Sequence, residues 1–177
     1  MIDPVLYWVT SFCLAALWLC AALGKWRAGR EFRQVLGAYK LLPLSLVPVV
    51  TLLLPLLELC LALGLVVSVT HSTAAFLSAA LLLAYALAIA INLLRGRIHI
   101  DCGCSLGKKQ AISWWLVWRN CGLASLALGL LLPLTQRQWH LADAMITLLV
   151  TVFICLAYPL VNMIIGNTHA LTNGVRQ

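Results

Sequence analysis

Five long runs of apolar residues occupy most of this chain, and they constrain its fold more than any other feature. Each run reaches the roughly 20 residues that a helix needs to cross about 30 Å of hydrocarbon at about 1.5 Å per residue. No run alternates polar and apolar residues as a barrel strand does, so helices are the way to satisfy the backbone in lipid. The predicted spans lie near residues 5–24, 44–69, 73–94, 111–133 and 141–165.

Composition supports the same conclusion. Hydrophobic residues make up 63% of the 177 residues and charged residues only 10%, whereas a soluble domain averages about 45–50% and about 25%. The spans and their short connections use nearly the whole chain. We therefore predict an all-α, polytopic membrane helix bundle of about five transmembrane helices. It forms a single integral membrane domain over residues 1–177, with no soluble domain.

The distribution of Lys and Arg predicts the orientation. The first run is not expected to be a cleavable signal peptide, because Asp3 precedes it and the basic residues follow it. By the positive-inside rule the basic loops face the cytoplasm, so the N-terminus is outside and the C-terminus is cytoplasmic. The net charge of +7 then indicates contact with membrane lipid headgroups, and no nucleic acid is expected. The basic residues on the cytoplasmic side are Lys25, Arg27, Arg30, Arg33, Lys40, Arg95, Arg97, Lys108, Lys109 and Arg176.

Cysteine placement excludes a disulfide scaffold. Only Cys102 and Cys104 of the seven cysteines lie in a loop. The others fall inside predicted spans, where cysteine behaves as a small apolar side chain. They are Cys13, Cys20, Cys60, Cys121 and Cys155.

The Asp101-Cys102-Gly103-Cys104 segment is the strongest candidate for chemistry. A disulfide between Cys102 and Cys104 closes a small, strained ring, which is easier to reduce or exchange than an unstrained bond. The basic residues of the same loop favour the thiolate, which is the attacking form. His99 is a candidate proton acceptor, whereas Asp101 opposes thiolate formation.

Two other interpretations of this segment stay open. The two cysteines could have no chemical task. Alternatively, His99, Asp101, Cys102 and Cys104 are suitable ligand types for a metal, although four ligands within six residues crowd a tetrahedral site. We expect no metal and no cofactor.

Polar residues inside the spans form a second candidate site. Glu58 and Arg119 lie at similar predicted depths, and because an unpaired charge there costs several kcal/mol, each needs a partner. A Glu58–Arg119 ion pair fits the geometry, either as a structural lock or as a proton or ligand site. Asn120 belongs to the same polar core, as does Asn92. Asn92 and Asn162 are expected to form hydrogen bonds between helices near the cysteine segment. The histidines at span ends, His71 among them, are expected to be solvated.

Several motifs together resemble the MauE family of methylamine-utilisation membrane proteins, within the wider MauE/DoxX-like redox-associated group. The Asp101-to-Cys104 segment after Asn92 and Arg95-Gly96 is the most specific of them. The others are Tyr39-Lys-Leu-Leu-Pro43, Pro55-Leu-Leu-Glu58 with Gly64, and Trp118-Arg-Asn120.

The resemblance implies a protein of the bacterial cytoplasmic (inner) membrane that supports maturation of periplasmic methylamine dehydrogenase. Its client would be the disulfide-rich small subunit, and a thioredoxin-like periplasmic partner (MauD-like) would assist. One hypothesis is a membrane thiol–disulfide oxidoreductase acting through Cys102 and Cys104. The alternative is a non-enzymatic assembly or transport factor for the same client, with structural cysteines. A third hypothesis, reduction of a quinone, has no marked site in the sequence.

Overall fold

The computed structural model describes residues 2–96, 112–135, 138 and 140–174, without the side chains of 159 and 162–174. Across these residues every regular element is a helix, which confirms the predicted all-α class. The helices are α1 (Pro4–Arg27), α2 (Gly29–Tyr39), α3 (Val47–Gly64), α4 (His71–Leu94), α5 (Trp114–Gly129) and α6 (Leu141–Gly174).

Four helical segments in the described part of the chain are long and apolar enough to cross a membrane. They are Pro4–Arg27, Val47–Gly64, His71–Leu94 and Leu141–Tyr158. The predicted span at 111–133 contains α5, whose 16 residues fall just below the range of about 17–25 residues that is typical of a membrane span. The chain is a multi-pass membrane protein, and the prediction of about five transmembrane helices agrees broadly with this architecture.

Helix α2 was not predicted, because the sequence between the first two spans was interpreted as a loop. The helix is amphipathic: Phe32 and Tyr39 are buried, whereas Arg30 and Arg33 are exposed. It ends at Lys40, whose backbone is left-handed with a φ of 47°. Such a residue commonly terminates a helix.

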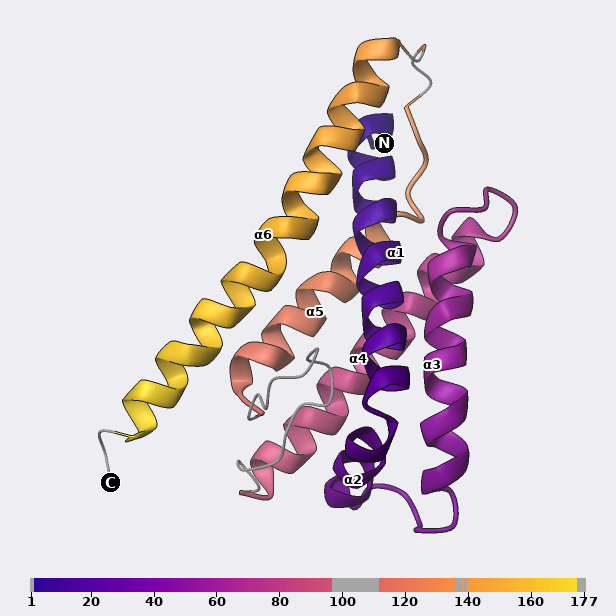
Figure 1. Cartoon of the computed structure of the whole chain (residues 1–177). Helices are drawn as coiled ribbons and strands as arrows, with labels where there is room; N and C mark the ends of the chain where they lie inside the picture. Colours follow the sequence, from indigo (N-terminus) through magenta and orange to yellow (C-terminus); the bar gives the residue numbers. More distant parts are fainter. Residues whose placement is uncertain (1, 97–111, 136–137, 139, 175–177) are drawn as a thin grey trace.

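The core lies where α1, α3, α4 and α5 meet, and Figure 1 shows α6 leaning away from the other helices toward its C-terminal end. Among the described residues, Trp18 of α1 is the largest fully buried side chain. Its indole donates a hydrogen bond to the Ser78 hydroxyl of α4 at 3.0 Å. Helices α4 and α5 bury alanines against each other, including Ala79 and Ala124. Small residues let helix backbones approach closely in a membrane.

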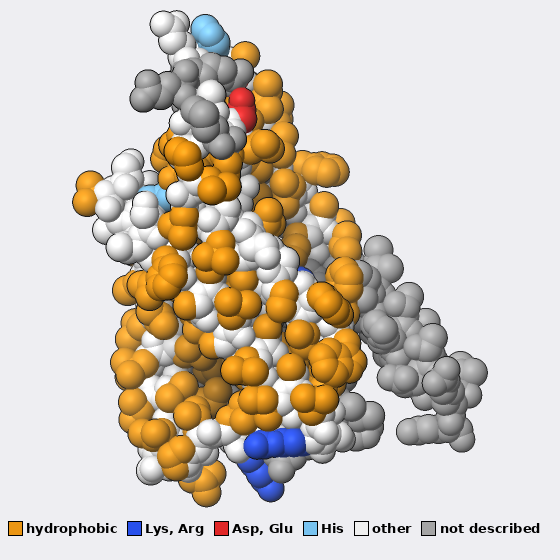
Figure 2. All heavy atoms as spheres, turned by 180° about the vertical axis from the view of Figure 1, so that it is seen from behind, with side chains coloured by type: hydrophobic (Ala, Val, Ile, Leu, Met, Phe, Trp, Pro, Cys, Tyr) orange, Lys and Arg blue, Asp and Glu red, His pale blue; other side chains and the backbone are white. Residues whose placement is uncertain are grey.

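The two ends of the molecule differ in charge. The last turn of α1, all of α2, the start of α3 and the end of α4 lie at one end, and the N-terminus and the start of α6 lie at the other (Figure 1). Figure 2 shows Lys and Arg at one end of an apolar surface. The basic residues were predicted to lie on one side of the membrane. Those that the structure describes lie at one end of the bundle.

Candidate functional site

The predicted cysteine site falls on residues whose placement is not described. His99, Asp101, Cys102 and Cys104 all belong to the segment 97–111 between α4 and α5. The helices on either side of this segment, α4 and α5, are described, and together with α1 and α3 they contribute to a polar core. We define this core as Lys25, Glu58, Tyr85, Asn92 and Asn120.

Lys25 and Glu58 form a buried ion pair that joins α1 to α3. Lys25 Nζ donates to Glu58 Oε1 over 2.6 Å, and their side chains are 2% and 0% exposed. The Lys25 ammonium also lies 5.5 Å from the ring centroids of Phe32 and Tyr85. Aromatic faces attract a cation, and more strongly where water is absent. The charge is thus held by one carboxylate and two rings.

Tyr85 of α4 adds a third helix to this pair. Its hydroxyl donates to Glu58 Oε1 over 2.6 Å, so one carboxylate oxygen accepts two hydrogen bonds. The other oxygen, Glu58 Oε2, is buried and has no hydrogen-bond partner among the described residues. A buried acceptor without a partner is costly. This oxygen is therefore a place where a water or a polar group could bind.

The structure corrects the predicted Glu58–Arg119 ion pair. Glu58 takes Lys25 as its charged partner. The half-buried Arg119 donates instead to the amide oxygen of its neighbour, Asn120 Oδ1, over 3.3 Å. The error arose because Lys25 was counted as a loop residue, whereas α1 continues to Arg27 and carries Lys25 into the bundle.

Asn92 and Asn120 are both buried, but no described hydrogen bond links them to another helix. The Asn162 side chain lies outside those that the structure describes. Asn92 Nδ2 donates to Ala88 O of its own helix over 3.0 Å. Asn92 Oδ1 and Asn120 Nδ2 have no hydrogen-bond partner in the part of the chain that the structure describes. Each of the two helices that border the cysteine segment therefore has one buried amide atom without a described hydrogen-bond partner: an acceptor on α4 and a donor on α5.

A second buried network lies near the opposite end of the bundle. His71 is 2% exposed, which corrects the expectation that it is solvated. Ser11 Oγ donates its only proton to Leu65 O at 2.7 Å, so His71 Nε2 donates to Ser11 Oγ at 2.9 Å. His71 Nδ1 then accepts from the Tyr7 hydroxyl at 2.7 Å. The network fixes α1 against the start of α4 and the end of α3.

Sequence reasoning missed Lys25 and Tyr85, although the pattern held a signal for both. Leu14, Trp18 and Ala22 form a buried stripe on α1, and Lys25 continues it at helical spacing. Tyr85 likewise follows Leu82 on the buried face of α4. A charged residue that continues such a stripe at the end of a span requires a buried counter-charge.

The sequence of this chain matches a known protein family. The family described as "Methylamine utilisation protein MauE" matches residues 3–133, which include the whole polar core and the cysteine segment. Helix α6 lies beyond that match. No solved structure matches the chain.

Individual relatives agree with the family match. The "Methylamine utilization protein MauE" of Paracoccus denitrificans is 47% identical over 131 residues, covering 73% of this chain and 70% of the relative. The protein of that name in Methylorubrum extorquens is 46% identical over 137 residues, covering 74% and 72%. That of Methylophilus methylotrophus is 35% identical over 167 residues, covering 93% and 88%.

Proposed function

The chain belongs to the MauE family of methylamine utilisation proteins, and from this premise we propose that it supports maturation of periplasmic methylamine dehydrogenase. It does so from the bacterial inner membrane, by thiol–disulfide exchange through Cys102 and Cys104. The client is the disulfide-rich small subunit, and a thioredoxin-like periplasmic protein (MauD-like) is the exchange partner.

The observation that carries this proposal is the Asp101-Cys102-Gly103-Cys104 segment, which lies within the family match. A strained two-cysteine ring suits exchange better than structural support. The helices that lead into and out of this segment pack together, with Ile89 of α4 and Leu116 of α5 in one buried cluster.

The proposed orientation has the N-terminus in the periplasm and the C-terminus in the cytoplasm. This puts the segment between α4 and α5 on the cytoplasmic side, whereas the client and the exchange partner are periplasmic. Exchange then requires that the segment reaches across the bundle or that electrons pass to a second cysteine pair; otherwise the orientation is the reverse. Labelling of Cys102 and Cys104 with a membrane-impermeant maleimide, in intact and in permeabilised cells, tests this assignment. Labelling only after permeabilisation is expected. Labelling of Cys102 and Cys104 in intact cells would contradict the proposed orientation.

The exchange itself is tested in a methylotroph whose own gene is deleted and replaced by variants of this chain. Cys102→Ser/Cys104→Ser should reduce mature methylamine dehydrogenase to the level of the deletion strain. The control is Cys20→Ser/Cys60→Ser, which changes two exposed cysteines on the span helices α1 and α3. Equal membrane levels of both variants, measured by immunoblot, exclude a folding defect.

If the Cys102→Ser/Cys104→Ser variant matures the client normally, the chain is a non-enzymatic assembly factor. The buried polar core favours this alternative, because Glu58 Oε2 is an acceptor with no described partner. In that case Lys25→Met should abolish maturation while the protein remains in the membrane.

A further inference from the structure

A row of basic side chains lies on the exposed side of α2. Arg30 and Arg33 are exposed residues of this helix, and the exposed Lys40 is its C-cap. At about 3.6 residues per turn, their spacing of three and then seven residues keeps them on one side of the helix. Phe32 and Tyr39 are buried on the other side, so the packing of α2 against the bundle fixes the direction of the row. We call Arg30, Arg33 and Lys40 the basic row.

The row contains a position that is open to a ligand. Gly37 is about one helical turn from both Arg33 and Lys40, and it has no side chain to separate them. A Cβ added at Gly37 would meet nothing within 4 Å in the described part of the chain. Two positive charges therefore flank an open stretch of helix surface.

The charges of the basic row are available to an external anion. No ion pair among the described residues uses Arg30, Arg33 or Lys40. Glu31 is the acidic residue of α2, but it directly follows Arg30, and residues adjacent in sequence do not face each other on a helix. An arginine guanidinium can donate two parallel hydrogen bonds to a phosphate. The row is thus suited to a partner that carries phosphate.

Exposed apolar side chains on both sides of α2 indicate that the helix lies at the surface of the bilayer. Trp26 precedes the helix, and Leu41 and Leu44 follow it; all three are exposed, Leu44 by 82%. Trp is enriched where hydrocarbon meets the lipid headgroups, and exposed leucines are more stable against lipid than in water. Figure 2 shows Lys and Arg side chains at one end of an apolar surface. A basic amphipathic helix in this position is suited to anionic lipid.

We propose that the basic row is a binding site for an anionic phospholipid of the phosphatidylglycerol class. The lipid phosphate lies over Gly37 between Arg33 and Lys40, and Arg30 contacts the rest of the headgroup. The acyl chains lie against the exposed leucines that follow the row. This site does not depend on thiol–disulfide exchange, because no cysteine takes part in it.

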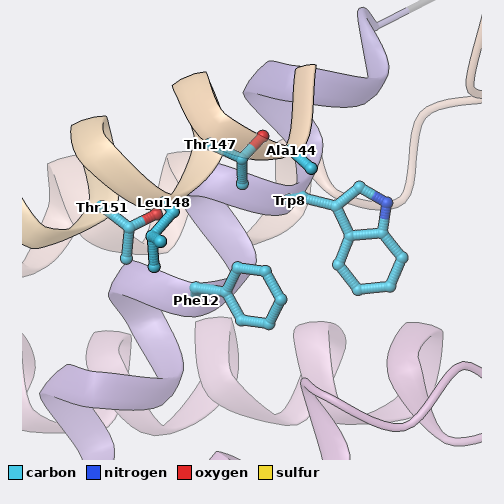
Figure 3. Close-up of a pocket in the computed structure, with 6 residues that line it drawn as sticks. All are labelled: Trp8, Phe12, Ala144, Thr147, Leu148 and Thr151. Atoms are coloured by element: carbon cyan, nitrogen blue, oxygen red, sulfur yellow. The ribbon is translucent and has the colours of Figure 1, made fainter. Parts of the chain in front are cut away.

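A second place for lipid chains lies toward the opposite end of the bundle. An apolar hollow of about 580 Å³ opens between α1 and α6, and Figure 3 shows Trp8 and Phe12 of α1 facing Leu148 and its neighbours on α6. No charged residue lines this hollow, so it accepts an acyl chain without selecting a headgroup. Selection between headgroups on identical acyl chains therefore reports on the basic row.

The site is tested with the full-length protein, purified in detergent and titrated with dioleoylphosphatidylglycerol or dioleoylphosphatidylcholine. Native mass spectrometry counts the bound lipids. The two lipids share their acyl chains and differ in net charge. Three basic residues should make the first phosphatidylglycerol bind on the order of a hundredfold more tightly than phosphatidylcholine. Equal dissociation constants for the two lipids would overturn the proposal.

A charge-matched pair of variants distinguishes a site from general attraction. Arg33→Gln/Lys40→Gln should weaken phosphatidylglycerol binding about thirtyfold, which corresponds to about 1 kcal/mol for each charge. The control Arg95→Gln/Arg176→Gln removes the same net charge from the same predicted side of the membrane. It should weaken binding by less than about threefold, because distant charges are screened. Phosphatidylcholine should bind all three proteins equally, which shows that the variants are folded.

Two results with these variants would contradict the site. Equal weakening of phosphatidylglycerol binding by both variants would show that the lipid responds to net charge alone. Unchanged binding by Arg33→Gln/Lys40→Gln would show that the row faces solvent or an acidic protein.

A competitor separates a lipid site from a site for a soluble anion. Glycerol phosphate carries the phosphate without acyl chains, so it should not displace phosphatidylglycerol at equal concentration. Displacement would show that the row binds a soluble phosphate compound, and the proposal of a lipid site would fail.

Discussion

Lys25 Nζ on α1 lies 2.6 Å from Glu58 Oε1 on α3, and water reaches neither side chain. The pair connects the end of the first span to the middle of the second, and Tyr85 extends it to the third. Two buried charges are tolerated only because each neutralises the other, so the pair makes these helices interdependent.

Removing one member of this pair should destabilise the protein strongly. Lys25→Met leaves a buried carboxylate without its counter-charge, and such a loss typically costs about 3–5 kcal/mol. Thermal unfolding in detergent measures the effect. Adding Glu58→Gln to Lys25→Met should recover part of the loss, because no lone charge remains. Arg27→Met, which changes an exposed residue of the same helix end, is the control and should shift the transition little. Equal shifts for Lys25→Met and Arg27→Met would contradict the ion pair.

The Tyr85 hydroxyl should stabilise the protein through its hydrogen bond to Glu58. Tyr85→Phe removes a hydrogen bond to a charged group, at a cost of about 1.5–3 kcal/mol. In a Glu58→Leu background the same substitution should cost much less, because its acceptor is gone. A double-mutant cycle on unfolding free energies measures this coupling. Additive effects would show that the 2.6 Å contact between Tyr85 and Glu58 contributes nothing to the free energy of unfolding.

Ser11→Ala should disrupt the network around His71. The substitution leaves the Leu65 carbonyl and His71 Nε2 without the partner that each has at present, at about 1–3 kcal/mol for each buried group. Ser125→Ala is the matched control, since Ser125 is exposed and bonds only Cys121 O in its own helix. Its effect should stay within about 0.5 kcal/mol. If both variants unfold at the same temperature, the buried network does not stabilise the bundle.

Gly64 should be required for the close packing of α3 against α4. A Cβ at this position would lie 2.9 Å from Ala74 Cβ, closer than side-chain carbons approach. Gly64→Ala therefore forces the helices apart, at a cost of about 1–3 kcal/mol. Gly122→Ala is the control, because a Cβ there meets nothing within 4 Å. The control should be neutral or slightly stabilising, and an equal loss in both variants would contradict the close approach.

The spans could be predicted because the requirement to satisfy the backbone in lipid acts on each apolar run separately. Helix α2 was missed because it has only 11 residues, four of them charged or amide side chains, and it packs against the bundle through Phe32, Val35 and Tyr39. Such packing depends on distant residues, among them Ile89 and Leu116. These contacts cannot be inferred from a hydropathy pattern.

Most residues of the polar core could be predicted from the sequence, but the ion pair that they form could not. Glu58, Asn92 and Asn120 were identified because polar groups inside a span need partners. The choice of Lys25 over Arg119 depends on how far α1 extends and which face it turns inward. The depth of each residue along its span limits the candidate partners of Glu58. The rotation of each helix about its axis determines which of them contacts Glu58.

The most direct test of the central claim is to trap the exchange intermediate. Cells that express the client and its thioredoxin-like partner carry either Cys102→Ser or Cys104→Ser, each of which leaves one thiol in the segment. After an acid quench, a non-reducing gel should show, from at least one variant, a mixed disulfide with the partner or the client that reductant dissolves. The Cys102→Ser/Cys104→Ser chain should show none. If neither single variant forms an adduct and both mature the client normally, the chain does not act by thiol–disulfide exchange.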